Sequence, residues 1–98
     1  MLRGQSIAPL VQPRTDSSGT PGNATANTSS GRCSIAAAGT TVTITNSICT
    51  ANSKVFATIA TNDATALLKN VVPAAGSFII TLNAATTAQT SIDWMVVN

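Results

Sequence analysis

The sequence predicts an all-β protein, a small antiparallel β-sandwich of about six strands preceded by an extended N-terminal arm. Three observations support this fold class. Short segments alternate apolar and polar residues with period two and are rich in β-branched residues, which is typical of strands. Turn residues separate these segments at the spacing usual for small sandwiches. The composition also changes near residue 32, because residues 1–31 lack the alternation.

The arm, residues 1–31, holds three of the four prolines and four of the six glycines of the chain. Proline withholds a backbone donor, and Ser, Thr and Asn compete for backbone hydrogen bonds, so we expect no regular element there. The arm is either a linker with incidental apolar residues or a segment that docks on a neighbouring subunit. The second hypothesis makes six residues candidate contacts with a partner: Leu2, Arg3, Ile7, Leu10, Val11 and Arg14.

The sandwich is expected over residues 32–98. Residues 33–37 and 41–45 are predicted to form a first hairpin, with the turn at residues 38–40, where Gly39 stands. The other predicted strands cover residues 54–61, 67–72, 77–84 and 91–98, and residues 73–76 form a turn between two of them. The last strand carries apolar residues on both faces, so we expect it to be buried on both.

The three aromatic residues, Phe56, Phe78 and Trp94, all fall inside predicted strands. Packing in the core or at a subunit interface is therefore the expected role of each. Asp93 lies beside Trp94 but points to the opposite face because side chains alternate along a strand.

The two cysteines are predicted to be free and buried. A hairpin turn at residue 39 would put Cys33 opposite about residue 45, so Cys49 would lie beyond the end of the pairing. A disulfide would require Cys49 to fold back. Sixteen residues separate the two thiols and the chain has no histidine, so the sequence also offers no zinc-type site.

Catalytic groups are scarce. The chain has no His and no Glu, which leaves Asp16, Asp63 and Asp93 as its carboxylate side chains, and Asp63 lies in a predicted turn. We expect a protein that is not an enzyme and needs no cofactor. A glycosidase-like pair of aspartates remains a distant alternative.

Charge and hydropathy also bound the partners. Only 8% of the residues are charged, and the five cations, which give a net charge of +2, are scattered along the chain. Nucleic-acid binding would favour clustered cations with aromatic residues between them, so we expect no nucleic-acid partner. No apolar run has the length of a membrane span or of a secretory signal. We therefore expect the protein to assemble in the cytoplasm and not to associate with a membrane.

Several short motifs of turn and core residues occur along residues 21–98: Gly22-Asn23, Gly31-Arg32, Thr45-Asn46-Ser47, Thr50-Ala51-Asn52-Ser53, Gly76-Ser77-Phe78 and the closing segment Trp94 to Asn98. With these motifs, residues 21–98 resemble a β-sandwich module of tailed-bacteriophage virion proteins, found in tail fibres and related tail proteins and in small capsid-associated proteins. Proteins that this chain resembles usually have Ala or Val at the positions of Cys33 and Cys49. The resemblance therefore implies that both cysteines are core residues.

The resemblance implies display or attachment on a phage particle, commonly as a trimer, with no catalytic residue. The expected function is that of a capsid decoration (cement) protein on the outer surface of the head, assembled in the cytoplasm of the bacterial host. Its expected partners are the major capsid protein, reached by the arm, and further copies of itself in a homotrimer. The alternative is a tail-fibre or tail-tip component that binds a glycan or protein of the host surface.

Overall fold

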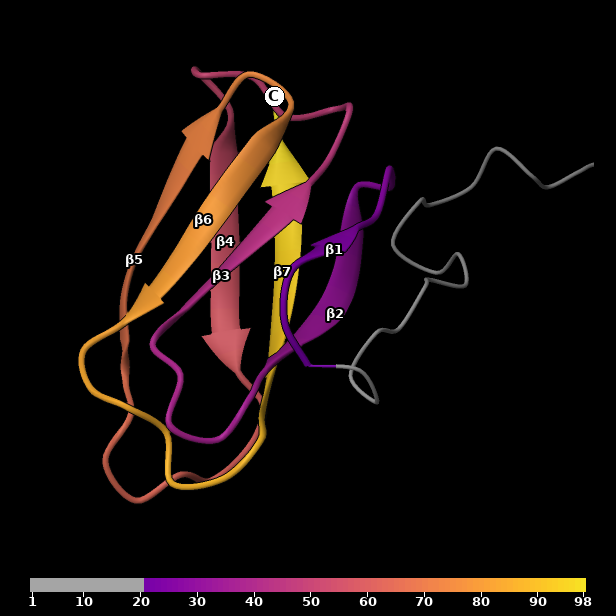
Figure 1. The fold of residues 1–98 in the computed structure, drawn as a ribbon. Coiled ribbons are helices and arrows are strands. Elements are labelled where there is room, and N and C mark those ends of the chain that lie inside the picture. Colours follow the sequence, from indigo (N-terminus) through magenta and orange to yellow (C-terminus); the bar gives the residue numbers. More distant parts are fainter. Residues whose placement is uncertain (1–20) are drawn as a thin grey trace, which may run out of the picture.

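A computed structural model of the protein describes residues 21–98, which form seven strands and no helix (Figure 1). The predicted all-β class and sandwich are confirmed. The candidate arm contacts between Leu2 and Arg14 lie outside the described residues. The strands are β1 (Ala24–Thr25), β2 (Ser30–Ile35), β3 (Thr41–Thr45), β4 (Lys54–Ile59), β5 (Leu68–Ala74), β6 (Ser77–Leu82) and β7 (Thr90–Val97).

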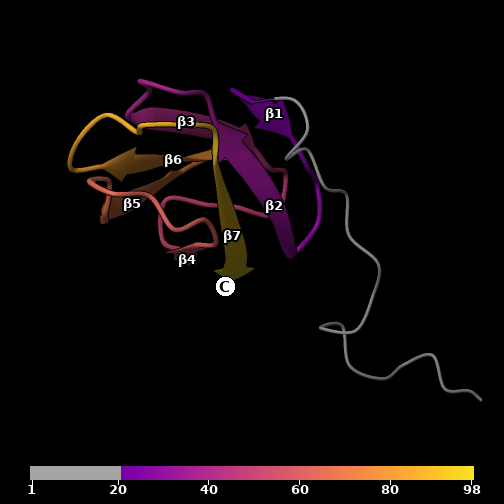
Figure 2. The same ribbon diagram turned by 90° about the horizontal axis from the view of Figure 1, so that it is seen from below.

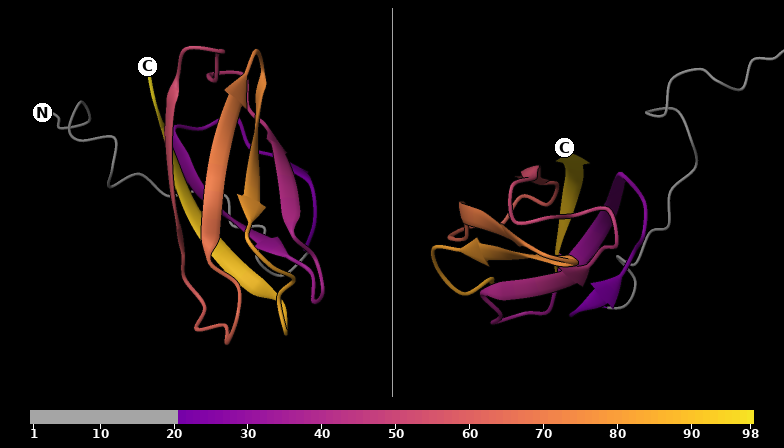
Figure 3. Two further views of the ribbon diagram at one scale, coloured as in Figure 1. Left: turned by 90° about the vertical axis from the view of Figure 1, so that its left-hand side faces the viewer. Right: turned by 90° about the horizontal axis from the view of Figure 1, so that it is seen from above.

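The strands form two sheets that face each other (Figure 2). One sheet has four strands in the order β1-β3-β6-β5, and the other has three in the order β2-β7-β4. Every neighbouring pair is antiparallel except β1 and β3, which are parallel. At one side of the sandwich β4 and β5 lie beside each other although they belong to different sheets (Figure 3).

The core lies between the sheets and is built by the alternation that the sequence shows. Phe78 of β6 and Trp94 of β7 meet in it edge to face, with ring centroids 5.1 Å apart, so the core prediction is right for both. Gly31 lies opposite Trp94 in the register, and a β-carbon on Gly31 would stand 2.7 Å from the indole ring. The other large buried apolar side chains are Ile35, Val42, Ile44, Ile80, Leu82, Ile92 and Val96.

The predicted first hairpin is wrong. β2 and β3 follow each other in the chain but belong to different sheets, so residues 36–40 cross between the sheets. β2 pairs instead with β7, where Cys33 lies opposite Ile92. A glycine between two alternating segments is equally compatible with a hairpin turn and with a crossover, and only the distant partner decides between them.

The hairpin that does form joins β5 and β6. Its turn is Ala75-Gly76, and Gly76 has a φ of +82°, which favours glycine. The predicted turn at 73–76 is therefore too long, because Pro73 and Ala74 belong to β5. Proline is tolerated there because β5 is an edge strand.

The sandwich begins before residue 32. β1 and the first two residues of β2 lie within the predicted arm, and β1 is the seventh strand that the sequence analysis missed. Asparagine side chains attach this segment to β3 and the turn after it: Thr43 N donates to Asn23 Oδ1, and Ser47 N donates to Asn27 Oδ1, both at 2.9 Å. The polar composition that predicted irregular chain thus supplies the hydrogen bonds that order it.

β7 is buried on one face only, contrary to the prediction of burial on both. Ile92, Trp94 and Val96 point into the core, whereas Met95 is half-buried and Val97 is 40% exposed on the opposite face. Residues 21–98 contain no third layer that covers that face.

Both cysteines are free and buried, as predicted. Burial, with a smaller effect from the negative charge of Asp93, raises the pKa of the Cys33 thiol to about 12. A thiol with such a pKa stays protonated at neutral pH and is a poor nucleophile. Cys33 therefore acts as a small apolar side chain, and Cys49 is buried in the same core.

Candidate interaction surface

The outward face of the β2-β7-β4 sheet carries the most prominent exposed aromatic side chain of the described chain. Phe56 of β4 is 58% exposed, so the core-packing prediction does not hold for it. Val55, Ala57 and Ile59 point toward the core, and Phe56 lies between them in sequence, so the alternation directs its ring outward. Register places Met95 of β7 directly beside it on the same face.

A shallow groove of about 270 Å³ runs along this face next to the Phe56 ring. We call it the β4–β7 groove. Its floor is the paired backbone of the two strands, where Thr58 lies opposite Asp93. The residues that line the groove are Phe56, Ala57, Thr58, Asp93, Trp94 and Met95.

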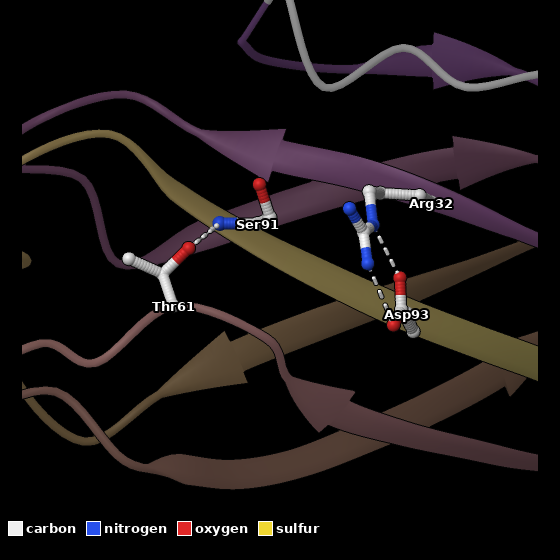
Figure 4. A network of polar contacts seen from close by, with 4 residues as sticks. All are labelled: Arg32, Thr61, Ser91 and Asp93. Carbon is white, nitrogen blue, oxygen red and sulfur yellow. Dashed lines mark hydrogen bonds and ion pairs between the residues drawn. The ribbon is translucent and has the colours of Figure 1, made fainter.

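An ion pair borders the groove on its β2 side (Figure 4). Arg32 and Asp93 are register partners, and two contacts join them: Nε to Oδ1 at 2.5 Å and Nη2 to Oδ2 at 3.1 Å. Both side chains are more than two-fifths exposed, so solvent screens the pair and its contribution to stability is small. The middle of the outward face therefore carries two opposite charges side by side, whose net charge is zero.

The end of the sheet near Ser91 is fixed by a second contact in the same view. Ser91 N donates to Thr61 Oγ1 at 2.9 Å (Figure 4). Ala60 N also donates to Ser91 O, at 2.8 Å. The connection after β4 is thereby held against β7, which fixes the register of the two strands at that end.

Asp63 holds two loops together at the same end of the sandwich. Its Oδ1 accepts hydrogen bonds from Thr87 N and Oγ1, at 2.9 and 2.7 Å, and its Oδ2 accepts from Thr65 N and Ala66 N, at 3.1 and 2.9 Å. The side-chain bond from Thr87, then the backbone bonds, lower the pKa of Asp63 well below its usual range. A carboxylate so engaged suits a turn, as the sequence predicted, and is a weak base.

The Asp63→Asn substitution is expected to lower the free energy of unfolding at pH 7, because the amide nitrogen cannot accept hydrogen bonds. Since the folded-state pKa is depressed, the carboxylate stabilises the fold above its ordinary pKa of about 4, and this contribution fades as the pH falls further. Denaturant unfolding from pH 7 to pH 2 measures this. The difference between wild type and variant should shrink below about pH 4; a constant difference would contradict the assignment.

A second hollow, of about 420 Å³, lies beside Asp63 and is lined mainly by the loop after β4. The side chains of Asp63 and Thr61, which line it, are already hydrogen-bonded, and Asp93 does not line it. Neither hollow therefore has both described carboxylates among its lining residues. Asp16, the third, lies outside the described residues.

Sequence reasoning missed two polar arrangements. The Arg32–Asp93 pair joins residues 61 apart, and it becomes visible only once β2 is known to pair with β7. Asn46, expected only as a turn residue, is fully buried and makes four hydrogen bonds. Its one sequence signal was its place between polar turn residues directly after an alternating strand.

Residues 21–98 contain no group of three or more metal-binding side chains. Within the same range, no helix is long and apolar enough to cross a bilayer. The fold and the surface define a small all-β sandwich with an outward aromatic side chain beside a shallow groove. No family model, curated protein or solved structure matches the chain.

Proposed function

We propose that the protein is a structural component of a tailed-bacteriophage virion, and that it acts as a capsid decoration (cement) protein. The sandwich sits on the outer surface of the head, and residues 1–20 contact neighbouring subunits of the major capsid protein. The proposal includes self-association on the particle, which the resemblance suggests is trimeric. In this role the protein performs no catalysis and uses no cofactor.

One observation carries the proposal: within residues 21–98 the carboxylates and the thiols, the groups best suited to chemistry, are engaged in hydrogen bonds, in an ion pair or in core packing. Asp63 is saturated by hydrogen bonds, Asp93 is paired with Arg32, and both thiols are buried and free. The residues that carry the resemblance to virion modules also lie in turns and in the core. Asn46 and Gly76 form turns, and Phe78 and Trp94 form the core.

The mechanism follows from valency. A chain that contacts several capsid subunits at once makes its later contacts intramolecular, so even weak contacts hold the subunits together. Shell expansion would then have to break several contacts in concert. The apolar residues Ile7, Leu10 and Val11 are the proposed anchors.

Binding to empty capsids tests the proposal. Purified protein should bind capsids that lack it and raise the temperature at which their shells come apart. The triple substitution Ile7→Ser/Leu10→Ser/Val11→Ser should abolish both effects, whereas Ser17→Ala/Ser18→Ala, a matched change in the same segment, should leave them intact. Capsid binding that survives the triple substitution would refute the proposed role of the arm.

One observation favours the alternative, a tail-fibre or tail-tip component that binds a host surface glycan or protein. Phe56 is exposed beside the β4–β7 groove, and an aromatic ring next to polar groups suits the stacking of a sugar. A density map of the virion separates the two functions, because cement copies follow the icosahedral lattice and fibre components follow the tail.

A further inference from the structure

The outward face of the three-stranded sheet leaves apolar side chains in water beside the β4–β7 groove. Phe56 and Val97 are exposed there. Met95 adjoins both, because it is the register partner of Phe56 and the outward residue before Val97. The surface of the groove itself is almost entirely apolar. A continuous apolar surface beside a groove indicates a place where another segment or molecule binds.

The chain enters the sandwich at the edge of this same sheet. Gly22 N donates to Ser34 O at 2.9 Å, so Gly22 lies beside the outer edge of β2. The next residue, Asn23, already accepts a hydrogen bond from Thr43 N of the four-stranded sheet. The chain before Gly22 is thus attached to the sandwich at the three-stranded sheet.

The groove is close to this attachment point. Neighbouring strands lie about 4.8 Å apart, so the line between β7 and β4 is about 12 Å across the sheet from Gly22. Ser34 pairs with Ser91, and the middle of the groove lies about three residues further along β7, which adds about 10 Å. The direct distance from Gly22 to the groove is therefore about 16 Å.

The number of residues before Gly22 suits this distance. Ten residues separate Val11 from Gly22. A linker of that length has a root-mean-square span of about 18 Å, close to the distance to be covered. A linker whose span matches the distance gives its segment an effective concentration of about 1 mM at the groove. At micromolar protein concentration, the segment of the same chain therefore outcompetes that of a second copy.

We propose that the β4–β7 groove binds residues 7–11 of the same chain, the segment Ile7-Ala8-Pro9-Leu10-Val11. Within residues 1–20 this segment is the longest run without a polar side chain. Docking removes its apolar side chains and the ring of Phe56 from water until a partner displaces the segment. The inference does not depend on the proposed virion function, because it concerns the isolated protein.

The segment has the chemistry that such a groove accepts. Pro9 fixes its own φ and restricts Ala8 to extended conformations, so less entropy is lost on docking. A polyproline II segment repeats every three residues, which puts Ile7 and Leu10 on one side, about 9 Å apart. Grooves lined by aromatic side chains bind such segments, and Phe56 is the aromatic residue here.

Size and charge agree with this occupant. A cavity of about 150 Å³ accommodates benzene, so a groove of about 270 Å³ has room for the smaller side chain of Leu10. Asp93 is the one charged residue that lines the groove, and it is paired with Arg32. The uncharged segment therefore covers no unpaired charge.

Thiol labelling of the full-length protein tests the proposal. Thr58→Cys puts a thiol in the groove, whereas both native thiols are buried. A maleimide should label this variant at least about tenfold more slowly than a chain that also carries Ile7→Ser/Leu10→Ser/Val11→Ser, because a tenfold protection means that the segment is docked in about nine of ten molecules. Ile79→Cys, on the outward face of the other sheet, is the matched control. Its labelling rate should be the same with and without the triple substitution.

A second pair of variants tests the place of docking. When Phe56→Ser is added to Thr58→Cys, the labelling rates with and without the triple substitution should become equal. Val72→Ser, which removes an exposed apolar side chain from the other sheet, should leave the tenfold difference in place. Circular dichroism verifies that each variant is folded.

Three outcomes would overturn the proposal. Equal labelling of Thr58→Cys with and without the triple substitution would show that the segment does not cover the groove. A difference that survives Phe56→Ser would place the docking site elsewhere. Protection that fades on dilution would show that the segment comes from a second copy.

These outcomes are separable from those of the capsid experiment. Capsid binding that requires the apolar segment, together with equal labelling rates, would leave the virion proposal in place and refute the docking alone. A labelling difference in a protein that binds no capsid would do the reverse.

Discussion

The Asn46→Ala variant should lose about 3 kcal/mol of unfolding free energy. The buried amide donates from Nδ2 to the carbonyls of Ala26 and Thr28, at 2.7 and 2.8 Å, and its Oδ1 accepts from the amides of Ile48 and Cys49, at 2.9 and 3.1 Å. Removing it leaves four backbone groups without this partner, and each buried group left unsatisfied costs about 1–3 kcal/mol, part of which water recovers. Urea denaturation measures the loss.

Asn46→Asp is the sharper variant of the same experiment. It preserves shape but points a carboxylate oxygen at two carbonyl oxygens, so it should destabilise the fold at least as much as alanine does at pH 7. Asn52→Ala, in the exposed turn that follows, is the matched control and should stay within about 0.5 kcal/mol of wild type. An Asn46→Ala variant as stable as that control would contradict the structural role of Asn46.

The Phe78→Ala variant should lose about 3–5 kcal/mol of unfolding free energy, the range observed when a buried aromatic side chain is truncated. Phe78 is fully buried and packs edge to face on Trp94, so its removal leaves a cavity in the contact between the sheets. Thermal and chemical unfolding both report the loss. For a small domain of limited core, it is a large part of the total stability.

The neighbouring residue on the same strand provides the control for this core prediction. Ile79 points outward and is 42% exposed, so Ile79→Ala removes a similar apolar group without making a cavity. Its effect should stay below about 1 kcal/mol. Equal losses of unfolding free energy in the two variants would contradict the assignment of Phe78 to the core face of β6 and of Ile79 to its exposed face.

The strands were predictable from sequence where alternation is strong. Residues 41–45, 54–59 and 77–82 follow the expected segments, because β-branched side chains directed to one core also fix the period. β1 was not predictable in this way. Its two residues are held by the side chains of Asn23 and Asn27, which give no periodic signal.

Pairing was the part that the sequence left open. Local alternation indicates which face of a strand is buried but not which strand lies beside it. No local pattern could therefore have shown that β2 and β3 do not form the predicted hairpin. The exposed surface was partly predictable. Val55 and Ile59 as inward residues already direct Phe56 outward, but the groove beside it exists only because β7 lies next to β4.

The central place of β7 in its sheet has a consequence for synthesis on the ribosome. β2 and β4 each hydrogen-bond to β7 and not to each other, and β7 is the last of the seven strands to be made. Until it emerges, both wait without a neighbour in their sheet, while the partners within the other sheet are already present. Since distant pairings also slow folding, the nascent chain passes through a stage with unpaired strand edges, during which it is most open to aggregation or to capture by a chaperone.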